Sequence, residues 1–156
     1  IRVSYMVLPP SLLERYRENC GFYASTVSRI DQRILNEFIK NGYFERYLNK
    51  MRKHYREKHD FLLEQLRGLE RSFVLSGENA GLHVLLKSRR GVPERELVQA
   101  AYRERIKVYG LSDSLTEDTD EKEEQGTVLL GYGALTKEEI REGVERLKRA
   151  WGNLLY

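Results

Sequence analysis

The stretch from residue 43 to 69 is the part of the sequence that most constrains the fold. It contains no Gly or Pro before Gly68, and its apolar residues recur at intervals of mostly three and four. That spacing places them on one face of an α-helix and leaves the other face to solvent. The stripe consists of Phe44, Tyr47, Leu48, Met51, Tyr55, Leu62, Leu66 and Leu69. The sequence therefore predicts a helix of about seven turns at ~3.6 residues per turn.

The chain changes character after Gly68 and alternates short apolar runs with helical patterns. Four candidate strands lie at residues 72–75, 82–86, 106–109 and 128–130. A helix is expected after Pro93, and the capping box Thr136-x-x-Glu139 predicts a last helix. The order is β-β-α-β-β-α. We expect an α/β fold, an α+β sandwich in which a small antiparallel or mixed sheet carries helices on one face.

The segment before the long helix is less regular. Residues 3–8 (VSYMVL) are apolar with β-branched and aromatic members, so we expect a strand or a buried extended segment that ends at Pro9. A short helix is expected over residues 11–19, capped by Ser11. A second is expected from an N-cap at Ser25 or Thr26 to Asn41-Gly42.

Composition excludes several classes of protein. The 156 residues are 40% hydrophobic and 33% charged, which is ordinary for a globular chain and unlike a disordered one. No apolar run approaches the ~18–20 residues of a membrane span, so no membrane partner is expected. The lone Cys20 rules out a disulfide within the chain and fits a reducing compartment, hence a cytoplasmic protein. A net charge of +3 is too small to indicate nucleic-acid binding.

Local motifs for catalysis or metal binding are weak. His54 and His59 are five residues apart and so do not share a helix face, and no second Cys is available for a metal site. Cys20 has no local base pattern and is expected to be a partly buried thiol. The bases of the long helix are expected to form a solvated face, and the acidic stretch 117–125 a solvated loop.

A resemblance is carried by several segments in chain order. Arg2–Pro9 resembles the Arg-x-Gly-Tyr-x-x-x-Pro segment of fold-type I pyridoxal phosphate (PLP) proteins. Residues 38–55, with Gly42, Arg46, Met51-Arg52 and Tyr55, resemble a run of the MocR type, as do Gly81-Leu82-His83, 108–112 and 129–135. These are GntR-family transcriptional regulators, in which a winged-helix DNA-binding head is fused to an aminotransferase-like domain.

The resemblance implies the C-terminal part of that domain. Residues 1–42 would be a remnant of the large PLP-binding domain, 43–69 the connecting helix and 70–156 the small α/β domain. Arg2 stands where the family's arginine binds the PLP phosphate, for which a planar guanidinium is suited. The lysine that forms the Schiff base would lie upstream. Because the chain starts at Ile1, inside an apolar segment, we expect a domain cut from a longer protein.

The resemblance also implies a function and its partners. We expect an effector-binding domain, not catalytic by itself, that acts in a homodimer with an amine or amino-acid effector and contacts DNA only through an absent winged-helix domain. Departures are Ser4, Tyr47 and the segment Gly126-Thr127-Val128, which stands where aminotransferases often place a carboxylate-binding Arg. One alternative is a true PLP-dependent aminotransferase, and another is an α/β interaction module unrelated to PLP.

Overall fold

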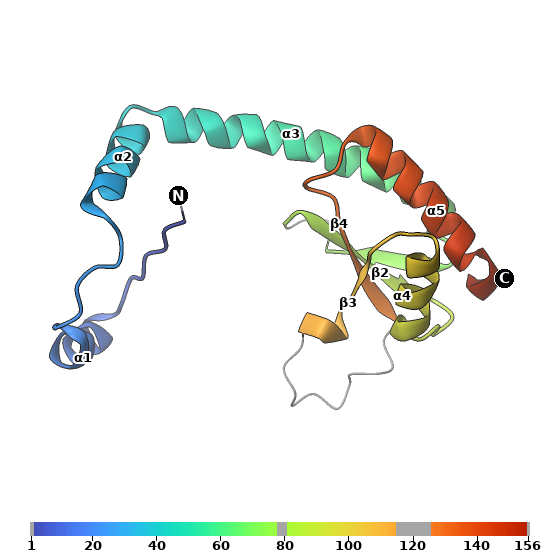
Figure 1. The fold of residues 1–156 in the computed structure, drawn as a ribbon, viewed down its shortest axis with the longest axis horizontal. Coiled ribbons are helices and arrows are strands. Elements are labelled where there is room, and N and C mark those ends of the chain that lie inside the picture. The colour runs from blue at the N-terminus through green and yellow to red at the C-terminus, as the bar shows by residue number, and fades with distance from the viewer. Residues whose placement is uncertain (1, 78–80, 115–125, 156) are drawn as a thin grey trace. The chain divides into compact units, whose positions relative to one another are not determined.

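The computed structural model describes residues 2–77, 81–114 and 126–155, and it separates into two compact units (Figure 1). The first unit is Ile1–Lys50 and the second is Met51–Tyr156. The boundary falls within helix α3 (Tyr43–Leu66), so that the first turns of α3 belong to one unit and its remainder to the other.

The first unit contains α1 (Pro10–Cys20), α2 (Arg29–Lys40) and the start of α3. Residues 2–8 form neither a strand nor a buried segment, and the side chain of Tyr5 is 92% exposed. The predicted strand is therefore wrong for this chain. A strand needs a neighbour to take its backbone hydrogen bonds, and the described residues supply none for this segment.

The N-caps of both short helices differ from the predicted ones. Pro9 is the N-cap of α1 and makes no side-chain capping bond, and Pro10 is the first helical residue, so Ser11 lies inside the helix. Ser28 caps α2, where its hydroxyl accepts hydrogen bonds from the backbone N–H groups of Ile30 and Asp31. The helix thus starts later than an N-cap at Ser25 or Thr26 requires. Its predicted end at Asn41 is confirmed.

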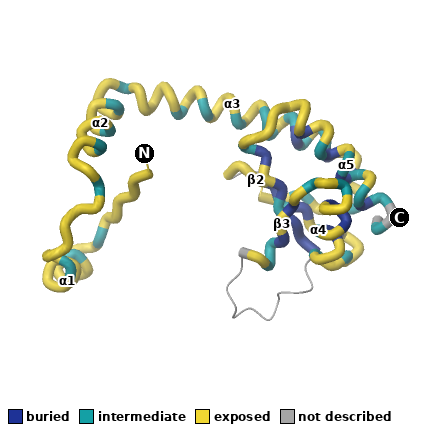
Figure 2. Tube along the Cα trace, viewed as in Figure 1, coloured by how far each residue is buried: buried dark blue, intermediate teal, exposed yellow. Residues whose placement is uncertain are grey.

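The first unit has no buried residue between positions 2 and 50 (Figure 2). Large apolar side chains lie exposed along its whole length. They are Val3, Tyr5, Met6, Val7, Leu12, Tyr16, Phe22, Tyr23, Ile30, Ile34, Ile39, Tyr43, Phe44 and Tyr47. Phe44 and Tyr47, which belong to the predicted apolar stripe of α3, are exposed because this unit has no core against which they could pack.

The second unit is built on an antiparallel sheet of order β1-β2-β4-β3. Its strands are β1 (Phe73–Ser76), β2 (His83–Ser88), β3 (Tyr109–Gly110) and β4 (Thr127–Gly131). The register pairs Leu86 with Val128 and Val84 with Leu130 across the two central strands. The helical elements of the unit are the end of α3, η1 (Arg67–Leu69), α4 (Glu94–Arg103), η2 (Ser112–Ser114) and α5 (Lys137–Leu155).

One face of this sheet is buried beneath the helices. Val84, Leu86, Val128 and Leu130 are buried, whereas the alternate residue Leu85 is only half-buried, which gives the sheet an inner and an outer face. The helices complete the core with Leu62, Leu66, Leu97, Ala100, Ala101, Ile140, Val144, Leu147 and Trp151. The predicted sheet with helices on one face is confirmed.

Two elements are shorter than predicted. The helical run from Tyr43 ends at Leu66 and tightens into η1, so the α-helix is shorter than the stripe. β3 contains two residues in place of the predicted 106–109. The acidic stretch 117–125 lies outside the described residues.

Candidate functional site

Arg2 is the residue that the sequence indicated for a cofactor phosphate. It lies in extended chain before α1 and is exposed. No hydrogen bond or ion pair of its guanidinium occurs within the described part of the chain. This donor set fits a phosphate group, because its paired N–H groups can meet two phosphate oxygens. The fit extends to the phosphate alone, since no other described residue accompanies Arg2 as a seat for a pyridine ring.

The lysines of the chain are the second element of a PLP site. A lysine that attacks a carbonyl must be neutral, which requires burial or a neighbouring cation. None of the described lysines is buried. Lys58 and Lys148 are half-buried, and both ammonium groups are engaged. Lys148 donates to the Glu145 carboxylate at 2.6 Å, and Lys58 donates to the carbonyl of Gly133 at 3.0 Å. This hydrogen bond also corrects the interpretation of Lys58 as part of a wholly solvated face.

Thr127 occupies the start of the last strand, where the resemblance would place a carboxylate-binding arginine. It is the first residue of β4, its side chain is buried, and its hydroxyl has no hydrogen-bond partner among the described residues. A buried neutral hydroxyl offers one donor and no charge. This position is therefore not equipped to bind a carboxylate as an arginine would.

A small polar cluster surrounds Tyr132 at the end of β4. Its hydroxyl donates to the carbonyl of Gly81 at 3.3 Å, and its ring lies 5.9 Å from the ring of His59. Burial raises the pKa of the Tyr132 phenol, and the Asp60 carboxylate adds to that effect. His59 Nδ1 lies 3.2 Å from Asp60, whereas its Nε2 is buried without a described partner.

The predicted capping box before α5 is present. The backbone N–H of Thr136 donates to Glu139 at 2.7 Å, and the N–H of Glu139 donates to the Thr136 hydroxyl at 3.2 Å. The hydrogen bond from the Thr136 backbone lowers the pKa of the Glu139 carboxyl below its ordinary value. The hydrogen bond with the Thr136 side chain and the charge of Lys58 lower it further. Glu139 therefore stays a carboxylate at neutral pH.

The described residues hold neither a cluster of metal ligands nor a membrane-spanning helix. No group of three His, Cys, Asp or Glu side chains lies together within the described residues, and no helix there is long and apolar enough to span a membrane. Cys20 is half-buried and not disulfide-bonded, as predicted.

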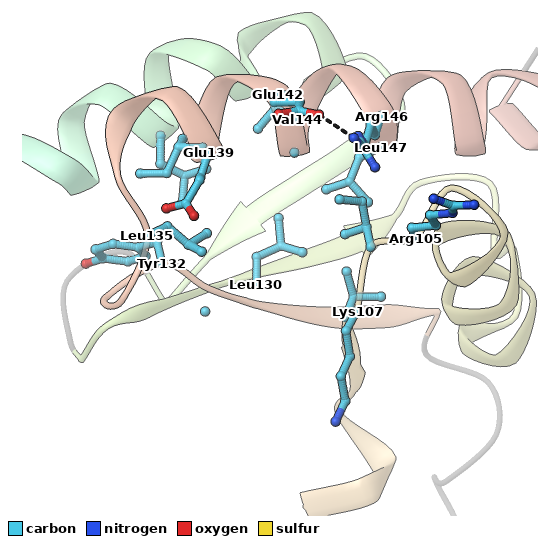
Figure 3. Close-up of a pocket in the computed structure, with 16 residues that line it drawn as sticks. Arg105, Lys107, Leu130, Tyr132, Leu135, Glu139, Glu142, Val144, Arg146 and Leu147 are labelled. Atoms are coloured by element: carbon cyan, nitrogen blue, oxygen red, sulfur yellow. Dashed lines mark hydrogen bonds and ion pairs between the residues drawn. The ribbon is translucent and has the colours of Figure 1, made fainter.

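A cavity of about 540 Å³ lies in the second unit between α5, β4 and residues 105–108 (Figure 3). Eight of the sixteen residues that line it are aliphatic. Its charged lining residues are Arg105, Lys107, Glu139, Glu142 and Arg146. This cavity was not predicted from the sequence. Two features of the sequence could have indicated it. Gly143 interrupts the helical pattern of α5, and no glycine follows the C-terminus of α4.

Comparison with known proteins supplies the family context. No family model matches the chain. It is 38% identical over 156 residues to YhdI of Bacillus subtilis, an HTH-type transcriptional regulator, covering 99% of this chain and 32% of that protein. It is 27% identical over 155 residues to MocR of Rhizobium meliloti, a probable rhizopine catabolism regulatory protein, covering 97% of this chain and 30% of that protein. The chain thus spans about a third of the length of the curated relatives it matches.

A solved structure gives the fold. The α-aminoadipate aminotransferase LysN from Thermus thermophilus, determined with N-(5′-phosphopyridoxyl)-L-leucine, matches with a TM-score of 0.73 and 25% identity over 96% of this chain and 37% of that chain. The chain therefore has the fold of part of a PLP aminotransferase. Its homologues are HTH-type transcriptional regulators that include MocR, which confirms the resemblance and the fold class predicted from the sequence.

Proposed function

We propose that this chain is the C-terminal part of the aminotransferase-like, effector-binding domain of a cytoplasmic MocR-type regulator. The observation that carries the proposal is the coincidence of two likenesses over nearly the whole chain. One is to an HTH-type regulator at 38% identity, and the other is to an aminotransferase structure at a TM-score of 0.73. A regulator built on an aminotransferase fold accounts for both.

In this proposal the described units correspond to recognisable parts of such a domain. Residues 1–42 belong to the large domain, 43–69 to the connecting helix and 70–156 to the small domain. The lack of any buried residue between 2 and 50 supports the first assignment, because a segment that fully buries none of its large apolar side chains requires further chain or a partner to cover them. The partner in this proposal is a second copy, in a homodimer.

Arg2 would hold the phosphate of PLP in the longer protein. The cofactor supplies an electron-withdrawing carbonyl that reacts with amines, and the protein supplies its position and electrostatic environment. Within this chain, Arg2 would anchor the phosphate through paired N–H donors. The amine-reactive lysine would come from chain that precedes Arg2.

The regulatory output of the longer protein would be DNA binding. An amine or amino-acid effector would change the arrangement of the domain and, through it, of the winged-helix heads. A true aminotransferase is the second candidate, favoured by the likeness to LysN. The neutral Thr127 in place of a carboxylate-binding arginine argues against it.

Two measurements test the proposal. The coding sequence upstream of Ile1 should encode a winged helix and, shortly before Arg2, a lysine; an unrelated upstream sequence would contradict the assignment. In that longer protein, PLP should shift the affinity for operator DNA, and transamination of common amino donors should be slow or absent. Rapid turnover without any DNA binding would establish the aminotransferase instead.

A further inference from the structure

The cavity between α5, β4 and residues 105–108 lies far along the chain from Arg2 and does not enter the proposed function. Its floor consists of buried aliphatic side chains, among them Leu62, Leu130 and Val144. A volume of about 540 Å³ falls within the range of small-molecule sites, which are mostly apolar with a few polar groups.

The cavity exists because strand pairing stops early. β3 and β4 pair only at Tyr109–Leu129 and Gly110–Val128. The backbone N–H of Leu111 donates to the carbonyl of Thr127, so the backbone polar groups of every second residue of β4, counted from Thr127, face β3. The backbone groups of Gly131 face the same side, yet no strand residue pairs with Gly131 on that side within the described sheet. Residues 105–108 diverge from β4 at this point and leave the opening.

Gly143 is the first of two locally unfavourable residues in the lining. It lies in the middle of α5, where glycine is a poorer helix former than alanine. A Cβ built on Gly143 meets nothing closer than Ile106 Cδ1 at 4.0 Å, so the surroundings do not require a glycine. A side chain at this position would instead project into the cavity, and glycine keeps the cavity open.

Arg105 is the second locally unfavourable residue in the lining of the cavity. It follows the C-terminus of α4 with φ 61°, and Ile106 N–H donates to the Ala101 carbonyl while Arg105 N–H donates to Tyr102, which together form a Schellman motif. This left-handed position favours glycine. Arg105 is nevertheless present and exposed, and its guanidinium has no hydrogen bond or ion pair in the described part of the chain. Departures from local preference that gather at one place are expected at functional sites.

The charges at the rim select the sign of a ligand. Figure 3 shows Arg105 and Arg146 at one end of the cavity and Glu139 with Tyr132 at the other. The Glu139 carboxylate already accepts a hydrogen bond from the Thr136 N–H and is attracted by the charge of Lys58. It therefore does not need a cationic ligand as a partner. Arg146 pairs with Glu142 and donates to the carbonyl of Glu104. Arg105 and Lys107 line the cavity without an ion pair among the described residues. The Lys107 ammonium lies 4.8 Å from the centre of the Tyr109 ring, and Arg105 is exposed.

We propose that this cavity binds a small apolar carboxylate, with its hydrocarbon part over Leu130 and Val144 and its carboxylate at the Arg105–Arg146 end. A guanidinium is suited to the planar carboxylate, and the aliphatic lining to the hydrocarbon chain. The site is separate from the proposed PLP phosphate site. It would give the second unit its own response to a metabolite.

Octanoate is the probe for this site, with octylamine and octanol as charge controls. Titrated into the whole chain and followed by amide NMR, octanoate should give saturable shifts at Ile106, Gly131 and Gly143. Nuclear Overhauser contacts should connect its methylenes with the methyl groups of Leu130 and Val144. Octanol should bind at least about fivefold more weakly. Equal binding of octylamine, or no saturable binding of octanoate, would overturn the proposal.

Variants separate the two halves of the site. Gly143→Leu should fill the cavity, raise the melting temperature and abolish octanoate binding, with Gly152→Ala as the control for helix propensity. Arg105→Gly should relieve the left-handed strain and stabilise the chain, yet weaken octanoate roughly tenfold. Arg105→Lys should weaken octanoate binding less than Arg105→Gly does, because it keeps the charge but loses the planar pair of donors. Arg103→Ala should leave octanoate binding unchanged. Unchanged octanoate contacts in Gly143→Leu would place the binding elsewhere. If that variant does not fold, the methyl contacts of the native chain decide alone.

Discussion

The indole Nε1–H of Trp151 on α5 donates to the backbone carbonyl of Leu97 on α4, at 3.0 Å, and both side chains are fully buried. The ring also lies 4.9 Å from Phe73 on β1. One side chain therefore joins α4 and α5 to β1 at the edge of the sheet.

Trp151→Phe is expected to lower the free energy of unfolding by about 1–3 kcal/mol, since it removes a buried hydrogen bond and some packing volume. Trp151→Ala should cost about 3–5 kcal/mol. Urea unfolding measures both, with the exposed Tyr102→Phe as control, for which a change within about 0.5 kcal/mol is expected. A Phe variant as stable as the native chain would show that the hydrogen bond contributes nothing net.

The capping box of α5 predicts a pH dependence. The pKa of Glu139 is lowered in the folded chain, so its contribution to stability is present above the pKa of the unfolded chain and is lost as the pH falls through the lower folded value. Glu139→Gln should therefore lower stability at neutral pH and by progressively less in acid. Thr136→Ala keeps the backbone N–H that binds Glu139, so its cost of about 0.5–2 kcal/mol should depend less on pH. Urea unfolding at several pH values, with the exposed Glu138→Gln as control, checks this. A cost of Glu139→Gln that is the same at every pH would exclude the Glu139 carboxylate as the source of the pH dependence.

The elements that the sequence predicted well are those whose signals are local. The capping box of Thr136 and Glu139 and the helix end at Asn41 depend only on neighbouring residues, and both are present. The predicted apolar stripe is buried in α3 at Leu62 and Leu66, whereas its Phe44 and Tyr47 are exposed. The choice of Ser28 over Ser25 as N-cap lies within the same short polar stretch, and side-chain chemistry alone does not decide it.

The features that were missed depend on residues far apart in the chain. Residues 3–8 have strand composition, but a strand forms only where a partner strand is supplied. The cavity at Gly143 arises because β3 stops short of Gly131, which no single segment encodes. Arg2 remains a prediction, because its role depends on chain beyond the described residues.

PLP is expected not to attach covalently to this chain in stoichiometric amount. None of the described lysines is buried, and the lysine implied by the resemblance is not among these residues. Borohydride reduction of the chain mixed with PLP, followed by digestion and mass spectrometry, should give scattered substoichiometric labelling. One fully labelled lysine peptide would contradict the expectation.

In the longer protein, Arg2→Lys should weaken PLP binding, whereas in this chain it should alter stability by no more than about 0.5 kcal/mol.

The last prediction concerns the exposed apolar side chains of the first unit. Tyr5, Val7, Phe22 and Ile30 are each at least 73% exposed, and no residue from 2 to 50 is buried. Exposed apolar surface of this kind favours association. We expect the chain to self-associate through residues 2–50, with rapid amide exchange there at low concentration and protection appearing as oligomers form. The second unit should stay protected throughout, since it has its own core.

Sedimentation velocity over a range of concentrations, together with hydrogen exchange, measures both effects. Replacing Tyr5 and Val7 with Ser should reduce association, whereas the matched change of Tyr102, which is exposed on α4, should not. Added octanoate should leave the association unchanged, because the proposed cavity lies in the second unit. A strict monomer at high concentration, with residues 2–40 protected from exchange, would show that the first unit is stable without a partner.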